Sequence, residues 1–80
     1  MDVKQVVITT ISEQLFASDE EITPDVTLQD LGADSLDLVE FMILFEDVFD
    51  LDEIPESDLK LSMTVQKLTD YVQQFVQKAA

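Results

Sequence analysis

The residue of this sequence with the clearest chemical potential is Ser35, which lies in the segment Gly32-Ala33-Asp34-Ser35-Leu36-Asp37. The chain contains no histidine and no cysteine. A serine nucleophile of the Ser-His-Asp type needs a general base, and no imidazole is present to supply one. We therefore expect Ser35 to be an attachment point for another group, and we expect the chain itself not to be an enzyme.

The same absences restrict metal and redox chemistry. Disulfides and zinc sites with thiolate or imidazole ligands are excluded, which leaves weak carboxylate binding of hard cations. The acids of segment 47–53 raise the possibility of a calcium sensor, but a calcium loop needs its own glycine and Gly32 is the only glycine in the chain. We expect no metal site.

The charge of the chain is strongly negative and unevenly distributed. The chain has 18 acidic residues and only 4 basic ones, all lysines. Fifteen of the acids lie between residues 19 and 58, with no basic residue among them. Such a surface repels nucleic acids and anionic membranes and attracts basic protein surfaces. We expect a basic protein partner, no nucleic acid and no membrane insertion. The alternative is that the acids only keep a small domain soluble.

Nothing in the sequence marks a segment for export or for a bilayer. The N-terminus lacks a basic region followed by an apolar one, and the longest apolar run, residues 41–45, is far below the ~18 residues that a membrane span needs. We expect a cytoplasmic monomer consisting of one domain over residues 1–80.

Apolar residues at spacings of three and four predict a first amphipathic helix of about four turns that ends near residues 18–19. Its apolar positions are Val3, Val7, Ile8, Ile11 and Leu15. A long loop follows over residues 17–32, interrupted by Thr23-Pro24-Asp25. Val26, Leu28 and Leu31 are expected to anchor this loop on the core.

A second helix is predicted to begin after Asp34, which would be its N-cap, with Asp37 completing a capping box. Ser35 would then be exposed in the first turn. The face expected to pack on the core holds Leu38, Phe41, Met42, Phe45, Val48 and Phe49, and the opposite face holds Leu36, Val39, Ile43 and Leu44 among Asp37, Glu40, Glu46 and Asp47.

This second apolar face has two interpretations. Both faces of a central helix can be buried in a small bundle. However, burying unpaired carboxylates costs several kcal/mol each, and the chain has no arginine to pair with them. We therefore interpret the outer face as a docking surface on which apolar contacts give affinity and charges steer the partner.

Two further helical segments complete the expected fold. A short turn is predicted at Ile54-Pro55-Glu56, with proline near its first position. Thr64 is a plausible cap for a last helix, whose buried stripe would be Leu68, Tyr71, Val72, Phe75 and Val76. The predicted fold is an all-α four-helix bundle, with three long helices, one short helix and a long loop between the first and second helices.

Over nearly its whole length the chain resembles an acyl carrier protein of the freestanding kind. The resemblance is carried by Leu31-Gly32-Ala33-Asp34-Ser35-Leu36-Asp37 with Val39-Glu40, by Glu46-Asp47 with Phe49-Asp50, by Ile54-Pro55, and by Thr64-Val65 leading to Asp70-Tyr71-Val72. It implies that Ser35 carries covalent 4'-phosphopantetheine, attached by a separate phosphopantetheinyl transferase. Acyl groups would then be held as thioesters on the sulfur of that arm.

The resemblance also implies roles for the residues around Ser35. Basic docking surfaces of acyl-chain biosynthetic enzymes would meet Asp34, Asp37, Glu40, Glu46 and Asp47, with apolar contacts from Leu36, Val39 and Ile43. The acyl cargo could enter an interior cavity beside Phe41, Met42 and Phe45, although ordinary core packing predicts the same residues. Fatty-acid, specialised lipid and polyketide pathways all remain open.

One alternative from another functional class uses the same acids. An acidic helical protein can mimic nucleic acid and block a basic DNA-binding partner, in which case Ser35 would carry no prosthetic group.

Overall fold

The computed structural model describes residues 2–79, without the side chains of Glu56 and Ala79. It contains α1 (Val3–Leu15), α2 (Ser35–Phe49), the 3₁₀ turn η1 (Glu56–Asp58) and α3 (Val65–Ala79). Within the described residues there is no strand, only an isolated bridge between Thr27 and Thr64. The all-α class is thus confirmed.

The fourth helix of the expected bundle is not confirmed. The short segment is a single 3₁₀ turn of three residues, displaced from Ile54-Pro55-Glu56 to Glu56–Asp58. The Asp58 N–H donates to the Pro55 carbonyl at 3.1 Å, and the turn goes no further. Such a short 3₁₀ segment has no apolar stripe of its own to bury, so three α-helices form the bundle.

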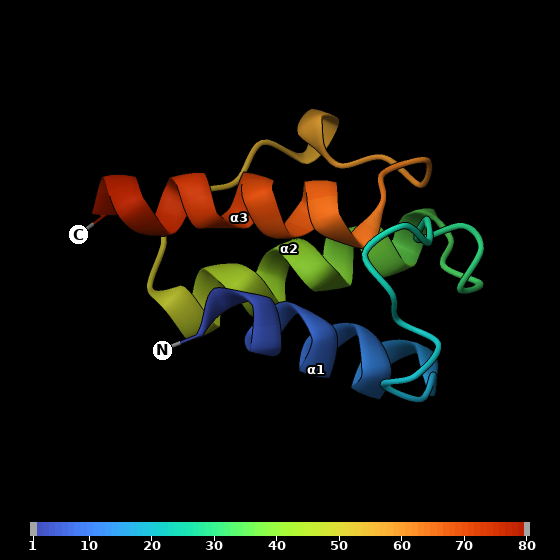
Figure 1. The fold of residues 1–80 in the computed structure, drawn as a ribbon. Helices are drawn as coiled ribbons and strands as arrows, with labels where there is room; N and C mark the ends of the chain where they lie inside the picture. The colour runs from blue at the N-terminus through green and yellow to red at the C-terminus, as the bar shows by residue number, and fades with distance from the viewer. Residues whose placement is uncertain (1, 80) are drawn as a thin grey trace.

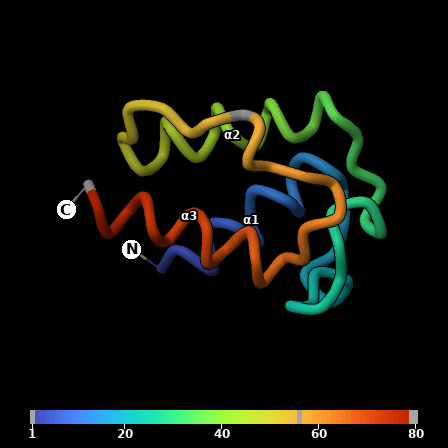
Figure 2. Tube along the Cα trace, turned by 90° about the horizontal axis from the view of Figure 1, so that it is seen from above, coloured from blue at the N-terminus to red at the C-terminus, as the bar shows by residue number. Residues whose placement is uncertain are grey.

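The helices lie side by side with α1 running opposite to α2 and α3 (Figure 1). A view turned by 90° shows that the connection between α2 and α3 returns along α2, so that these two helices run in the same direction (Figure 2). As a result, the end of α1 and the beginnings of α2 and α3 lie at one end of the molecule.

Helix α1 is capped by Asp2, whose carboxylate accepts from the backbone N–H groups of Lys4 and Gln5 at 3.1 and 3.5 Å. It ends at Leu15, earlier than the sequence predicts, because Phe16 adopts the left-handed conformation with φ of 57°. The apolar spacing is confirmed, since Val3, Val7 and Ile11 are buried.

The core lies between the three helices and the loops that connect them. Phe41 and Phe45 are fully buried, with their rings stacked at a centroid distance of 6.4 Å. The other large side chains with almost no exposed surface are Ile11, Leu28, Ile54, Leu68, Val7 and Val72. On α3, the cap by Thr64 is confirmed, because its hydroxyl accepts from the Lys67 N–H at 3.1 Å.

Two residues expected in the core are not part of it: Val48 on α2, and Phe75 on α3, whose half-buried ring meets Tyr71 edge-on and lies under the Lys78 ammonium. Val48 is 42% exposed, whereas Leu38, Met42 and Phe49 pack against the core as expected. At 100° per residue Val48 lies on the same side of α2 as Phe41 and Phe45, but it lines the groove between α1 and α2, where α1 does not cover it.

The loop between α1 and α2 is pinned onto the segment that precedes α3. Leu28 N–H donates to the Met63 carbonyl at 3.0 Å, and Val65 N–H donates to the Val26 carbonyl at 2.9 Å. Leu28 is fully buried and Val26 and Leu31 pack against the core, which confirms the predicted anchors.

The chain then turns at Gly32, whose φ of 91° favours glycine, and enters α2.

Among the described residues, no helix combines the length and the apolar character that crossing a membrane requires.

Candidate functional site

The first turn of α2 is held by the predicted capping box. The Asp34 carboxylate accepts from the Asp37 N–H at 3.1 Å, and the Asp37 carboxylate accepts from the Asp34 N–H at 2.9 Å. Asp34 has an extended backbone, as an N-cap residue requires. Because the two aspartates fulfil the capping role, Ser35 is not needed for it.

Ser35 is the first residue of α2 and is exposed, as predicted. Backbone N–H groups in the first turn of a helix have no carbonyl partner within the helix, and the helix dipole places partial positive charge there. A phosphate ester on Ser35 would therefore find free N–H donors and a favourable contribution of the helix dipole, roughly 0.3–1 kcal/mol at an exposed site, which the like charges of Asp34 and Asp37 oppose. The surroundings of Ser35 fit a phosphate-linked group.

Asp37 also ties α1 to the start of α2. The Gln14 side-chain amide donates to the Asp37 carboxylate at 3.3 Å. The Asp34 backbone N–H is the main cause that lowers the pKa of Asp37; partial burial acts in the opposite direction, and the Gln14 amide assists the lowering. Sequence reasoning missed Gln14, since nothing in the local pattern links it to a residue 23 positions away.

The predicted apolar contacts lie on the outer side of α2. Leu36 is 73% exposed, Ile43 is exposed and Val39 is half-buried. Glu40 and Asp47 are exposed on the same side. We refer to Leu36, Val39, Glu40, Ile43 and Asp47 as the outer face of α2; together with Asp34 and Asp37 it forms one surface next to Ser35.

Glu46 differs from the acids of the outer face, because it has a hydrogen-bond partner inside the chain. Its carboxylate is half-buried and accepts from the backbone N–H of Ile54 at 2.7 Å. Its carbonyl accepts from the Leu51 N–H at 2.9 Å. Glu46 therefore holds the buried Ile54 and the chain that leaves α2, a role that sequence reasoning missed.

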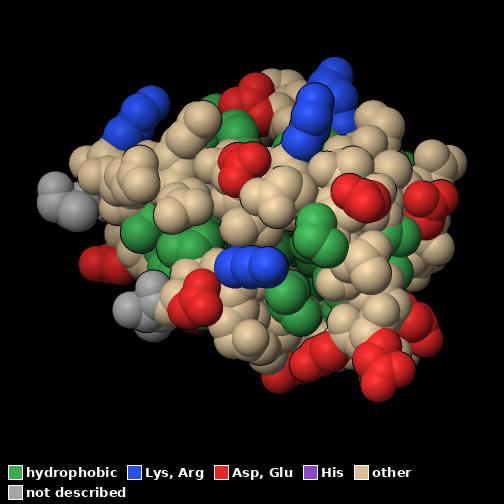
Figure 3. All heavy atoms as spheres, viewed as in Figure 1, with side chains coloured by type: hydrophobic (Ala, Val, Ile, Leu, Met, Phe, Trp, Pro, Cys, Tyr) green, Lys and Arg blue, Asp and Glu red, His purple; other side chains and the backbone are tan. Residues whose placement is uncertain are grey.

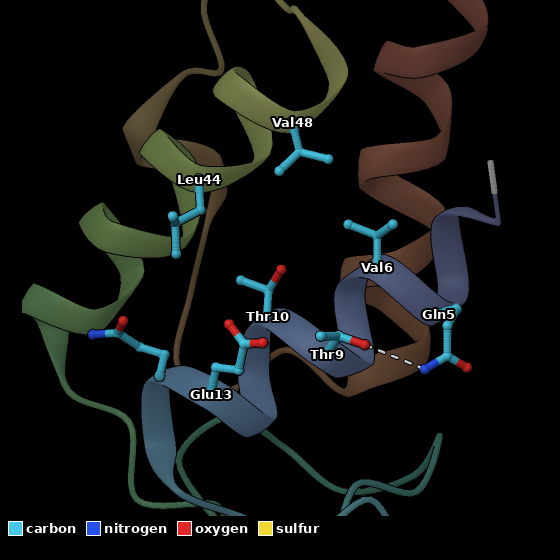
Figure 4. A pocket seen from close by; sticks show the side chains of 8 residues that line it. Gln5, Val6, Thr9, Thr10, Glu13, Leu44 and Val48 are labelled. Atoms are coloured by element: carbon cyan, nitrogen blue, oxygen red, sulfur yellow. Dashed lines mark hydrogen bonds between the residues drawn. The ribbon is translucent and has the colours of Figure 1, made fainter.

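A groove of about 550 Å³ runs between α1 and α2. In Figure 4, Leu44 and Val48 extend from α2 toward α1, where Val6 and Thr10 lie opposite. Gln5 and Thr9 are joined along the α1 side by a side-chain hydrogen bond of 3.2 Å.

This groove is not the interior cavity considered for the acyl cargo. Phe41 and Phe45 are fully buried in the core, and neither of them nor Met42 lines the groove. A smaller hollow of about 250 Å³ is lined by residues 51–53 with Phe75 and Lys78, again apart from those three side chains. An acyl chain inside the core stays a prediction.

Acidic side chains gather at the end of the molecule where the loop between α1 and α2 runs (Figure 3). Within residues 2–79, no group of three or more acidic side chains is arranged so that it could hold a metal ion. The negative charge at this end is therefore spread over separate exposed carboxylates, which suits recognition by a basic surface.

Comparison with known protein families agrees with this geometry. The family model described as "Phosphopantetheine attachment site" (PP-binding) matches residues 5–72. The match covers most of the chain, and the protein belongs to this family of carrier domains. Members of the family carry a covalently attached 4'-phosphopantetheine group and are not catalytic themselves. The resemblance to carrier proteins is thus confirmed at the level of the family.

Proposed function

We propose that this protein is an acyl carrier protein that acts in the cytoplasm as a monomer. Ser35 would receive 4'-phosphopantetheine, and the loaded protein would present acyl thioesters to enzymes of fatty-acid, lipid or polyketide biosynthesis. The observation that carries this proposal is the exposed Ser35 at the start of α2, directly after an N-cap that does not need its hydroxyl. The family match supports the same assignment.

The residues of the chain have distinct parts in this function. The Ser35 hydroxyl provides the oxygen that becomes esterified. As this oxygen bonds to the phosphorus next to the pantetheine of coenzyme A, the pyrophosphate bond breaks and 3',5'-adenosine bisphosphate leaves. The serine proton would pass to a base of the transferase, since the chain has no histidine to accept it. The capping box of Asp34 and Asp37 fixes the first turn, so that the serine is presented on a rigid helix end. The prosthetic group supplies the thiol that a chain without cysteine lacks.

The outer face of α2, with Asp34 and Asp37, would be the surface on which partner enzymes dock. Its carboxylates match lysines and arginines of a partner, and its exposed apolar side chains Leu36 and Ile43 give the contact area that charges alone do not provide. Glu46 would support this surface through its bond to Ile54 and would not itself contact the partner.

The absence of cysteine allows a direct test by thiol titration. The purified chain should react with no thiol reagent. After incubation with coenzyme A and a phosphopantetheinyl transferase, followed by removal of small molecules, it should show one thiol per chain, and Ser35→Ala should show none. A wild-type chain that gains no thiol would contradict the proposal, and one that instead binds a DNA-binding protein would favour nucleic-acid mimicry.

A further inference from the structure

Phe16 has two properties that are unfavourable in a folded protein. It lies in the left-handed region with φ of 57° and ψ of 34°, where glycine is the preferred residue at the end of a helix. Its side chain is also 95% exposed, more than any other large apolar side chain that the structure describes. Asp50 is the other described non-glycine residue with positive φ, and short polar side chains such as aspartate tolerate that conformation far better.

The structure holds Phe16 in this position. The Ser12 hydroxyl donates to the carbonyl of Ala17 at 2.6 Å, and Ala17 itself is buried. The backbone on both sides of Phe16 is therefore fixed, and the aromatic ring is displayed on a defined part of the surface. The exposed ring gains too little packing within the chain to offset the strained backbone. A phenylalanine at this position therefore points to a contact with another molecule.

Phe16 lies at the same end of the molecule as Ser35. Gln14, two residues before it, is bonded to Asp37 in the first turn of α2. Both views place the end of α1 and the beginning of α2 at one end of the bundle (Figures 1 and 2). Leu36 is a second exposed apolar side chain there.

Exposed carboxylates follow Phe16 closely in the chain and also lie beside Ser35. The exposed acids Asp19, Glu20 and Glu21 follow Phe16 in the chain, and Asp34 is exposed next to Ser35. A partner that accepts the ring therefore needs an apolar recess bordered by basic residues. A second copy of this chain does not meet that requirement, because each copy has a formal net charge of −14 and two such ends repel each other.

We propose that Phe16 is an aromatic anchor for the phosphopantetheinyl transferase, which binds it in an apolar recess with a basic rim. This inference rests on the proposed modification of Ser35. The transferase must bring its reacting atoms to the Ser35 oxygen itself, so its surface has to cover this end of the molecule. Enzymes that use the loaded arm react at its far end, so even when they dock on α2 they need not reach the Ser35 oxygen. Single buried aromatic residues commonly dominate the binding energy of such interfaces.

Phe16→Gly tests this proposal, because it should affect folding and binding in opposite directions. Glycine relieves the left-handed backbone, so the melting temperature should rise. Loss of the ring should raise KM for the carrier by about tenfold or more in loading assays with coenzyme A and the transferase of the same organism, with little change in kcat. Phe16→Asn should behave like Phe16→Gly, and Phe16→Tyr should keep the wild-type KM. Val48→Thr removes exposed apolar surface from another face and is the matched control, with KM unchanged.

The possible results separate this inference from the proposed function. A wild-type chain that cannot be loaded would overturn both. Normal loading of the wild type, with a KM for Phe16→Gly within twofold of it, would overturn only the role of Phe16. A lower melting temperature for Phe16→Gly would show that the ring stabilises the fold, and a wild-type dimer that Phe16→Gly dissolves would show that a second copy covers it; either result contradicts the proposal.

Discussion

Asp34 and Asp37 each accept a hydrogen bond from the backbone N–H of the other, at 3.1 and 2.9 Å, and Ser35 lies between them in the sequence. Two carboxylates thus fix the turn that displays the serine. In the proposed function the same pair would also provide part of the charge on which a basic partner docks.

The cap contributed by Asp34 can be measured by substitution. Asp34→Ala removes the acceptor for the Asp37 N–H and should lower the free energy of unfolding by about 1 kcal/mol. Asp34→Asn keeps an acceptor oxygen and should retain most of this stability. Urea denaturation of the two variants checks this prediction; equal losses would show that the charge of Asp34 matters and that its capping bond does not.

Glu46 should be important for folding. Glu46→Ala leaves the N–H of the buried Ile54 without its acceptor and should lower the free energy of unfolding by about 1–3 kcal/mol. Asp47→Ala is the matched control at the neighbouring exposed position and should change stability by less than about 0.5 kcal/mol. Similar results for both variants in chemical denaturation would refute a structural role for Glu46.

Tyr71 gives the protein a pH dependence in the alkaline range. Burial raises the pKa of Tyr71, and the hydrogen bond of 2.7 Å that it donates to the Asp58 carboxylate, together with the charge of that carboxylate, raises it further. A folded-state pKa above the unfolded value of about 10 means that the stabilisation is complete below that pH. It is lost as the pH rises through the folded-state pKa.

This dependence can be followed on a single chromophore, since Tyr71 is the only tyrosine and the chain has no tryptophan. Tyrosinate absorbance of the folded protein should appear at higher pH than in urea, and Asp58→Asn should shift it downward. Denaturation series above pH 10 should show a steeper loss of stability for the wild type than for Tyr71→Phe. This variant is the control for the lysines, which also lose their protons in this range and are present in both proteins. Superimposable titrations of the folded and unfolded chain would contradict the prediction.

Docking on the outer face of α2 should depend on its charge. Glu40→Lys replaces an exposed carboxylate on this face and should raise KM for the carrier in the transferase reaction, with stability unchanged or slightly increased because self-repulsion falls. Asp70→Lys makes the same charge change at an exposed position of α3. If the two variants raise KM equally, net charge governs the interaction and α2 has no special surface.

The sequence predicts the local features of this protein well. The capping box, the loop anchor Leu28 and the cap at Thr64 each follow from residue types within a few positions, and the structure confirms them. The bonds Gln14–Asp37 and Glu46–Ile54 depend on how distant segments pack, which no local pattern encodes.

The remaining errors also have physical causes. The sequence places the end of the first helix near residues 18–19, because phenylalanine rarely adopts the left-handed conformation that Phe16 has. Helical periodicity places Val48 on the core side of α2, but Val48 lines the open groove between α1 and α2, and the periodicity of one helix does not encode how closely a second helix covers it. The segment around Pro55 forms a 3₁₀ turn because it is too short to bury a stripe of its own.

The attachment of phosphopantetheine to Ser35 is tested most directly by the intact mass of the chain after incubation with coenzyme A and a phosphopantetheinyl transferase. The wild type and Ser18→Ala, a change at another exposed serine at the same end, should each gain the mass of one phosphopantetheine. Ser35→Ala should gain nothing. An unmodified wild-type chain, or a Ser35→Ala chain that is still modified, would contradict attachment at Ser35.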